Sequence, residues 1–80
     1  MRLEAEFTTE PFVGEGDPPT HAVAAHDAAV AAGLACDFGP LGTSAEGDAD
    51  AVLAALAPLV TAALEGGASR ITLQVQRAEG

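Results

Sequence analysis

The chain has 80 residues, the size of one domain, and a chain this short buries only about 60 to 65% of the surface that its unfolded form exposes. Twelve acidic side chains face three arginines and no lysine, and the resulting charge of −9 repels phosphate backbones and anionic bilayers, so we expect no nucleic-acid and no membrane partner. One cysteine precludes an internal disulfide, and no stretch resembles a signal peptide or membrane span, so we expect a single cytoplasmic domain over residues 1–80.

The composition predicts a thin hydrophobic core. The chain has no tryptophan, no tyrosine and three phenylalanines, so alanine, leucine, valine and isoleucine must fill the interior. Small side chains bury little apolar surface each, which limits the stability of an isolated chain of this length. We therefore expect self-association, as a homodimer or homotetramer.

The first predicted element is a strand over residues 2–8. Its residues alternate, with Leu3, Ala5 and Phe7 on one side and charged or hydroxyl side chains on the other, as in a half-buried strand. Residues 9–19 follow with three prolines and two glycines, which predicts a long exposed connection.

A helix is predicted next, over residues 20–32, because this run is rich in alanine. The pair Asp17-Pro18 indicates the N-cap and the first helical position, and Gly33 indicates the end of the helix. Val23 and Val30 lie seven residues apart and, with the alanines between them, predict a narrow buried stripe.

The second half of the chain predicts a hairpin, a helix and a last strand. The predicted elements are strands over 34–38, 43–46 and 71–76, and a helix capped by Asp48 or Asp50 that ends at Gly66-Gly67. The segment Gly39-Pro-Leu-Gly42 predicts the hairpin turn, and the strand after it has weak propensity. Pro58 lies inside the second helix and is expected to bend or break it.

This order of elements predicts an α+β fold, a ferredoxin-like βαββαβ sandwich in which a four-stranded antiparallel sheet carries both helices on one face. The helix-covered face would bear Leu3, Phe7, Leu73 and Val75. The other face would bear Glu4, Glu6, Thr72, Gln74 and Asp37. That face is either solvated or packed on another copy of the chain, with Arg2 and Arg70 offsetting some of the carboxylates.

The sequence offers few candidates for metal or catalytic chemistry. His21 and His26 lie five residues apart, a rotation of roughly 140° on a helix, whereas paired metal ligands usually lie four apart. Cys36 has no second cysteine to complete a zinc site and has apolar neighbours at alternate positions, so it is expected to pack. With no base placed beside a nucleophile, we expect a protein without catalytic residues, metal or cofactor.

The segment Gly42 to Gly47 crowds two hydroxyls and a carboxylate between glycines at the exit of the hairpin. The Glu46 carboxylate can accept a hydrogen bond from an exocyclic amine, and Thr43 and Ser44 supply donors and acceptors, which together suit a polar heterocycle. The alternative is a solvated edge strand in which Glu46 favours the N-terminus of the following helix.

Four segments spread along the chain together form a pattern that can be compared with known families. They are Phe7-Thr-Thr-Glu-Pro-Phe12, the helix end Ala-Gly-Leu34, Gly39-Pro-Leu-Gly-Thr-Ser-Ala-Glu-Gly47 and Ala63-Leu-Glu-Gly-Gly-Ala-Ser-Arg-Ile71. With these segments the chain resembles the small thiamine-binding protein family, whose members are short ferredoxin-like domains. The resemblance covers nearly the whole chain and implies a ligand, thiamine (vitamin B1) or its aminopyrimidine half.

The resemblance implies non-catalytic binding of this ligand by a small oligomeric protein. Thr43 and Glu46 match the family pattern Gly-Thr-x-x-Glu-Gly and are the ligand contacts it implies, with Ser44 between them. Phe12 and Phe38 are candidates for stacking on the ligand, or else for packing in the core or the loop. Thiamine is a cation and suits an acidic protein. The alternative is a self-associating regulatory or interaction module with a different ligand or none.

Overall fold

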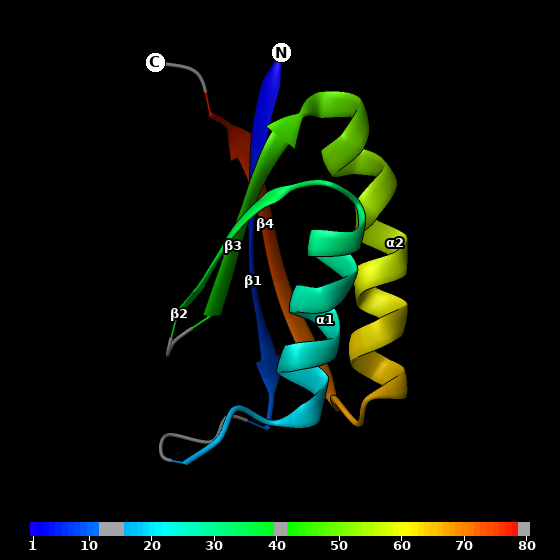
Figure 1. Ribbon diagram of the computed structural model, residues 1–80. Coiled ribbons are helices and arrows are strands. Elements are labelled where there is room, and N and C mark those ends of the chain that lie inside the picture. The colour runs from blue at the N-terminus through cyan, green and yellow to red at the C-terminus, as the bar shows by residue number, and fades with distance from the viewer. Residues whose placement is uncertain (12–15, 40–41, 79–80) are drawn as a thin grey trace.

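The structure is a computed structural model that describes residues 1–11, 16–39 and 42–78. Its elements are β1 (Arg2–Glu10), α1 (Thr20–Ala31), β2 (Ala35–Gly39), β3 (Gly42–Asp48), α2 (Ala49–Glu65) and β4 (Arg70–Arg77). The strands form one antiparallel sheet in the order β2-β3-β1-β4, and both helices lie on the same face of it (Figure 1). The prediction of a ferredoxin-like α+β fold is confirmed.

The core lies between this sheet and the two helices. Every second residue of β1 is buried there, from Leu3 through Ala5 and Phe7 to Thr9. The largest fully buried side chains are Leu59 and Val52, and alanines make up much of the rest of the core. The sequence-based expectation of an interior filled by small side chains is thus met in the part of the chain that the structure describes.

Helix α1 begins at Thr20, as the predicted range 20–32 does, but its N-cap differs from the predicted one. Its N-cap is Pro19, whose extended backbone (ψ 152°) lets its carbonyl accept from the N–H groups of Ala22 and Val23, at 3.0 and 3.2 Å. The prediction of an Asp17 cap is wrong, because Pro18 precedes a second proline and is thereby disfavoured from the helical conformation. The predicted end is confirmed, since Gly33 follows the helix with a left-handed φ of 84°.

The buried stripe of α1 also differs from the prediction. It consists of His21, Ala25 and Ala29, whereas the side chain of Val30 is half exposed. Small residues allow α1 and α2 to approach closely, and a Cβ added at Gly66 would lie only 3.0 Å from the Cα of His21. Close helix packing therefore turns the alanines inward and leaves Val30 outside.

Helix α2 runs without interruption through Pro58, so of the two predicted effects, a bend or a break, the break does not occur. The proline lies on the exposed side of the helix, and the residue four positions earlier, whose carbonyl it leaves without its usual partner, is also exposed. Water can satisfy that carbonyl while the opposite side packs on the sheet through Ala55 and Leu59. Neither helix that the structure describes is long and apolar enough to cross a bilayer.

Candidate functional site

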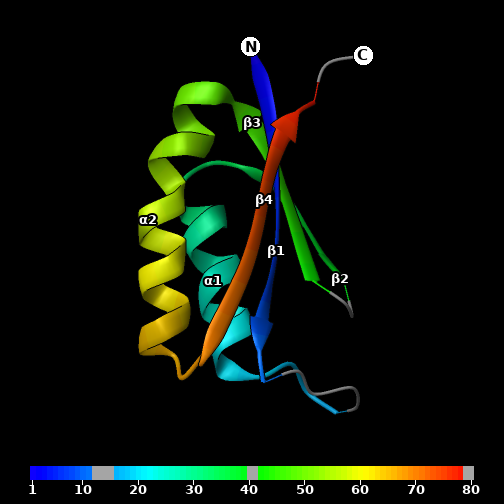
Figure 2. The ribbon, with the colours of Figure 1, turned by 180° about the vertical axis from the view of Figure 1, so that it is seen from behind.

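The face of the sheet that points away from the helices is covered by no other described element (Figure 2). Strand alternation and the pairing register place polar side chains on all four strands of this open face. They are Arg2, Glu4, Glu6, Thr8, Glu10, Asp37, Ser44, Glu46, Asp48, Arg70, Thr72, Gln74 and Gln76. The four residues predicted from alternation to share the face with Glu4 are all among them, so that prediction is confirmed.

One part of the open face is concave, and we call it the open-face hollow. It has a volume of about 400 Å³. Its lining is Glu6, Phe7, Thr8, Asp37, Gly39, Gly42, Thr43, Ser44, Thr72 and Gln74. Four of these form a row across the whole sheet, because Asp37 is opposite Ser44, Ser44 is opposite Glu6, and Glu6 is opposite Gln74. Polar groups from all four strands therefore converge on one concave surface.

Two glycines account for the depth of the hollow at the hairpin end. Gly39 and Gly42 are paired across β2 and β3, so neither residue of this pair places a side chain over the sheet. A Cβ at Gly42 would lie 2.7 Å from Thr8 Cγ2 and 2.9 Å from the carbonyl oxygen of Phe7, while one at Gly39 would meet Gly42 O at 3.4 Å. The backbone of Gly39 and Gly42 thus forms the floor of the open-face hollow at this end.

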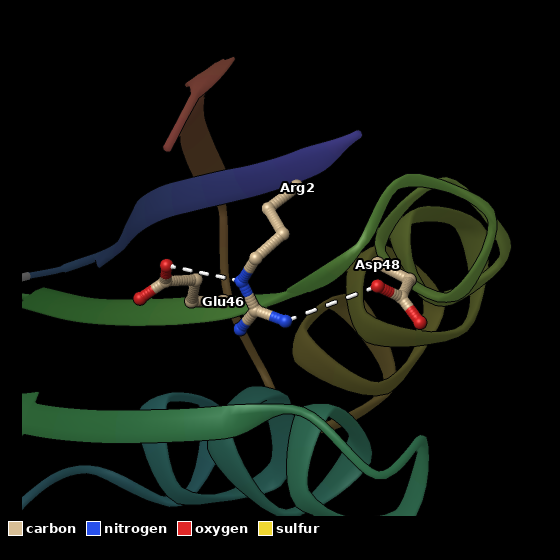
Figure 3. Close-up of polar contacts among 3 residues, drawn as sticks. All are labelled: Arg2, Glu46 and Asp48. Atoms are coloured by element: carbon tan, nitrogen blue, oxygen red, sulfur yellow. Dashed lines mark ion pairs between the residues drawn. The ribbon is translucent and has the colours of Figure 1, made fainter. Parts of the chain in front are cut away.

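Several carboxylates of the open face are bound to other side chains of the chain. Arg2 lies between Glu46 and Asp48, with Nε 3.6 Å from Glu46 Oε2 and Nη1 3.8 Å from Asp48 Oδ1 (Figure 3). Glu4 accepts a hydrogen bond of 2.9 Å from Gln76 Nε2. At the other end of the sheet Arg70 Nε lies 3.7 Å from Glu10 Oε2. These pairs are exposed, so each contributes little to stability.

The predicted contacts of the Gly42 to Gly47 segment separate in the structure. Ser44 lines the open-face hollow. Glu46 lies on the same face one row further along β3, where Arg2 binds it. The side chain of Thr43 points to the helix-covered face and is 5% exposed, so only the backbone of this residue borders the hollow. Of the three, Ser44 alone presents its side chain to the hollow.

Phe38, one of the two predicted stacking residues, does not join this group. The side chain of Phe38 points to the helix-covered side, where its ring stacks on His26 with centroids 4.9 Å apart and planes 23° from parallel. Phe12 falls outside the described residues. Sequence reasoning did not select Glu6, Thr8, Asp37, Thr72 and Gln74 as ligand contacts, although alternation already placed four of them on the open face. Their convergence depends on the strand register, which cannot be read from the sequence.

The other reactive side chains lie on the helix side of the sheet. His21 is buried and shares a hydrogen bond of 2.6 Å between its Nδ1 and Thr9 Oγ1. Cys36 donates its thiol to the carbonyl of Leu34 at 3.5 Å, and burial raises the pKa of the Cys36 thiol. Over residues 1–11, 16–39 and 42–78, no three histidine, cysteine or acidic side chains are grouped as metal ligands would be.

Solved structures with the same fold come from bacteria and archaea. A hypothetical protein from Methanocaldococcus jannaschii has a TM-score of 0.70 at 20% identity over 99% of this chain and 80% of its own. A Thermotoga maritima protein proposed to act in thiamine biosynthesis or salvage has a TM-score of 0.66 at 22% identity, over 95% and 81%. A domain of unknown function from Bacillus cereus has a TM-score of 0.66 at 19% identity, over 94% of this chain and 72% of its own. At these identities the likeness shows the fold.

The sequence comparison is more specific. No curated protein matches the chain. The family model described as thiamine-binding protein matches residues 5–78, which include most of β1, the other three strands, both helices and every described residue that lines the open-face hollow. The chain therefore belongs to the thiamine-binding protein family, and this membership supports a thiamine-related role.

Proposed function

We propose that this protein binds thiamine, or its aminopyrimidine half, without transforming it, and that the ligand occupies the open-face hollow. The family match over residues 5–78 carries the proposal. The hollow supplies the location, because it is a concave surface on which polar side chains from all four strands meet. Its volume of about 400 Å³ is within the range of roughly 300–1,000 Å³ that is usual for small-molecule sites.

The chemistry of the hollow complements that of thiamine. Thiamine has a positively charged thiazolium ring and an aminopyrimidine ring with several hydrogen-bond donors and acceptors. Glu6 and Asp37 provide negative charge, and Ser44 and Gln74 provide groups that both donate and accept hydrogen bonds. The glycine floor at Gly39 and Gly42 allows a flat ring to lie close to the backbone, in place of an aromatic side chain.

The composition of the hollow favours binding over catalysis. Among the described residues of its lining there is no histidine, cysteine, lysine or arginine, and the potential bases beside its hydroxyls are carboxylates. Both histidines belong to α1, on the far side of the sheet from the hollow. The family description, thiamine-binding, agrees with a ligand that is held and released unchanged.

Isothermal titration calorimetry with thiamine tests the proposal. We expect saturable binding by the wild-type protein, and an unchanged dissociation constant for Glu65→Gln, which removes an exposed charge at the end of α2, remote from the hollow. Thermal unfolding gives a second readout, because a ligand that binds only the folded state at a hundredfold excess over its dissociation constant stabilises it by about 2.7 kcal/mol. Absence of heat and of any stabilisation at millimolar thiamine would reject the proposal.

The second candidate is a self-associating interaction module, and the exposed apolar side chains outside the hollow favour association of the chain with itself. Leu53 and Leu64 of α2 are 53% and 51% exposed, and Val75 of β4 is 41% exposed. Such residues gain from burial in an interface, which a thin core makes useful. Sedimentation velocity over protein concentrations from about 1 to about 100 µM tests this candidate. A monomer at every concentration would contradict it. Association that does not depend on thiamine, in a protein that does not bind thiamine, would favour it over the first candidate.

A further inference from the structure

The open face carries six carboxylates, and the structure gives partners to four of them. Glu4 accepts from Gln76, Arg2 pairs with Glu46 and Asp48, and Arg70 pairs with Glu10. The two that remain, Glu6 and Asp37, have no hydrogen-bond or ion-pair partner among the described residues. Both of them line the open-face hollow, and none of the four partnered carboxylates does.

The chain cannot supply a cation to these two groups from its own arginines. It has three arginines and no lysine. Arg2 and Arg70 are engaged with other carboxylates. Arg77 pairs with Leu3 in the register of β1 and β4, which places its side chain on the helix-facing side of the sheet. None of the three arginines is therefore placed to pair with Glu6 or Asp37, which leaves both carboxylates available to a cationic ligand.

The spacing of the Glu6 and Asp37 carboxylates suits a ligand that is contacted at both of its ends. Ser44 lies between them in the row that crosses the sheet, so their backbones are two strand spacings, or about 10 Å, apart. A single small cation at one carboxylate would not contact the other. A molecule that carries a cationic ring at one end and an amino group at the other could reach both, with Ser44 beneath its middle.

We infer that Glu6 and Asp37 are the specificity-determining carboxylates of the site, and that Arg2 acts as an internal counter-ion that withholds Glu46 from the ligand. The inference rests on the proposed function and goes beyond it by naming the groups that select a cation. It also assigns Glu46 a different part from the one the Gly-Thr-x-x-Glu-Gly pattern implied. One carboxylate attracts the thiazolium charge and the other accepts from the exocyclic amine.

The test compares charge-neutralising variants of nearly unchanged shape. Glu6→Gln and Asp37→Asn should each raise the thiamine dissociation constant about tenfold at low salt, the size of effect expected for one charged contact at an exposed site. Glu46→Gln, the matched control on the same face, should change it less than about twofold because Arg2 already neutralises that carboxylate. Raising the salt concentration should weaken wild-type binding and narrow the difference between wild type and Glu6→Gln.

Thermal unfolding without ligand separates loss of recognition from loss of fold. Removing one of two unbalanced negative charges should leave the melting temperature of either variant equal to or above that of the wild type. If wild type binds and Glu46→Gln weakens binding while Glu6→Gln and Asp37→Asn do not, the inference is overturned and the proposed function stands. If wild type binds no thiamine, the proposed function fails, and the inference fails with it.

Discussion

The two faces of the sheet are built from the same four strands but differ in chemistry, one apolar and buried and the other polar. On the helix-covered face β1 presents Leu3, Ala5 and Phe7, which are at most 7% exposed. On the open face the residues between them are charged or carry a hydroxyl, and two of these, Glu6 and Thr8, line the hollow. If the ligand binds as we propose, stability and recognition are divided between odd and even positions along a strand, so that a change at one residue can affect either property with little effect on the other.

The helix-covered face should respond most strongly to truncation of its largest buried side chain. Leu59 is fully buried, and Leu59→Ala should lower the free energy of unfolding by about 2–5 kcal/mol, through lost burial and the cavity it leaves. That is a large fraction of the stability of a domain of this size. Urea unfolding measures the loss. Leu53→Ala, at a position 53% exposed on the same helix, is the control and should cost less than about 1 kcal/mol.

The independence of the two faces would be contradicted if Leu59→Ala bound thiamine tenfold more weakly while still folded, because the hollow lies on the other side of the sheet. That independence would be supported if the variant kept the wild-type dissociation constant for thiamine under conditions where it stays folded. A small loss of stability, similar to that of Leu53→Ala, would contradict the assignment of Leu59 to the core.

A substitution that fills part of the open-face hollow should have the opposite effect, lowering the affinity for thiamine and leaving the stability nearly unchanged. At Gly39 a methyl group would be in ordinary contact with the nearest backbone atom, at 3.4 Å, so Gly39→Ala should change the free energy of unfolding by less than about 0.5 kcal/mol. The same methyl group fills part of the hollow, and we expect thiamine to bind about tenfold more weakly, a difference of ~1.4 kcal/mol. Calorimetry on folded protein gives both the affinity and its enthalpy.

The control for this variant is Ala35→Ser, which adds one atom to the same face of β2 outside the lining of the hollow. It should leave the affinity unchanged. Equal affinities for Gly39→Ala and wild type would show that the ligand does not approach the hairpin end. Gly42 is the less useful position, because a Cβ there would collide with the Phe7 carbonyl oxygen at 2.9 Å and so disturb the fold itself.

Much of the fold follows from local sequence rules. Alternation located the strands and assigned their faces, and the glycine at 33 ended the first helix where the structure ends it. The errors arose where tertiary packing or a neighbouring residue decides. Close approach of the helices buries alanine and leaves Val30 exposed, and exposure on the outer side of α2 makes Pro58 tolerable.

The candidate site was less accessible from sequence, for a reason that the pattern itself contains. Thr43 and Glu46 are three residues apart, and an odd separation within a strand directs two side chains to opposite faces. The role that we infer for Glu6 and Asp37 depends on the register that sets both beside Ser44, and the pairing of Arg2 with Glu46 depends on the same register. No local rule fixes the register, because it is set by the assembled sheet.

The central claim is that the ligand binds the open face, and chemical-shift mapping of the amide resonances during a thiamine titration tests it most directly. The account predicts that the largest shifts occur at Glu6, Ser44 and Gln74, in the row that crosses the hollow, while Leu64 on the outer side of α2 stays unchanged. Largest shifts at His26 and Phe38, the stacked pair on the helix side, would contradict it.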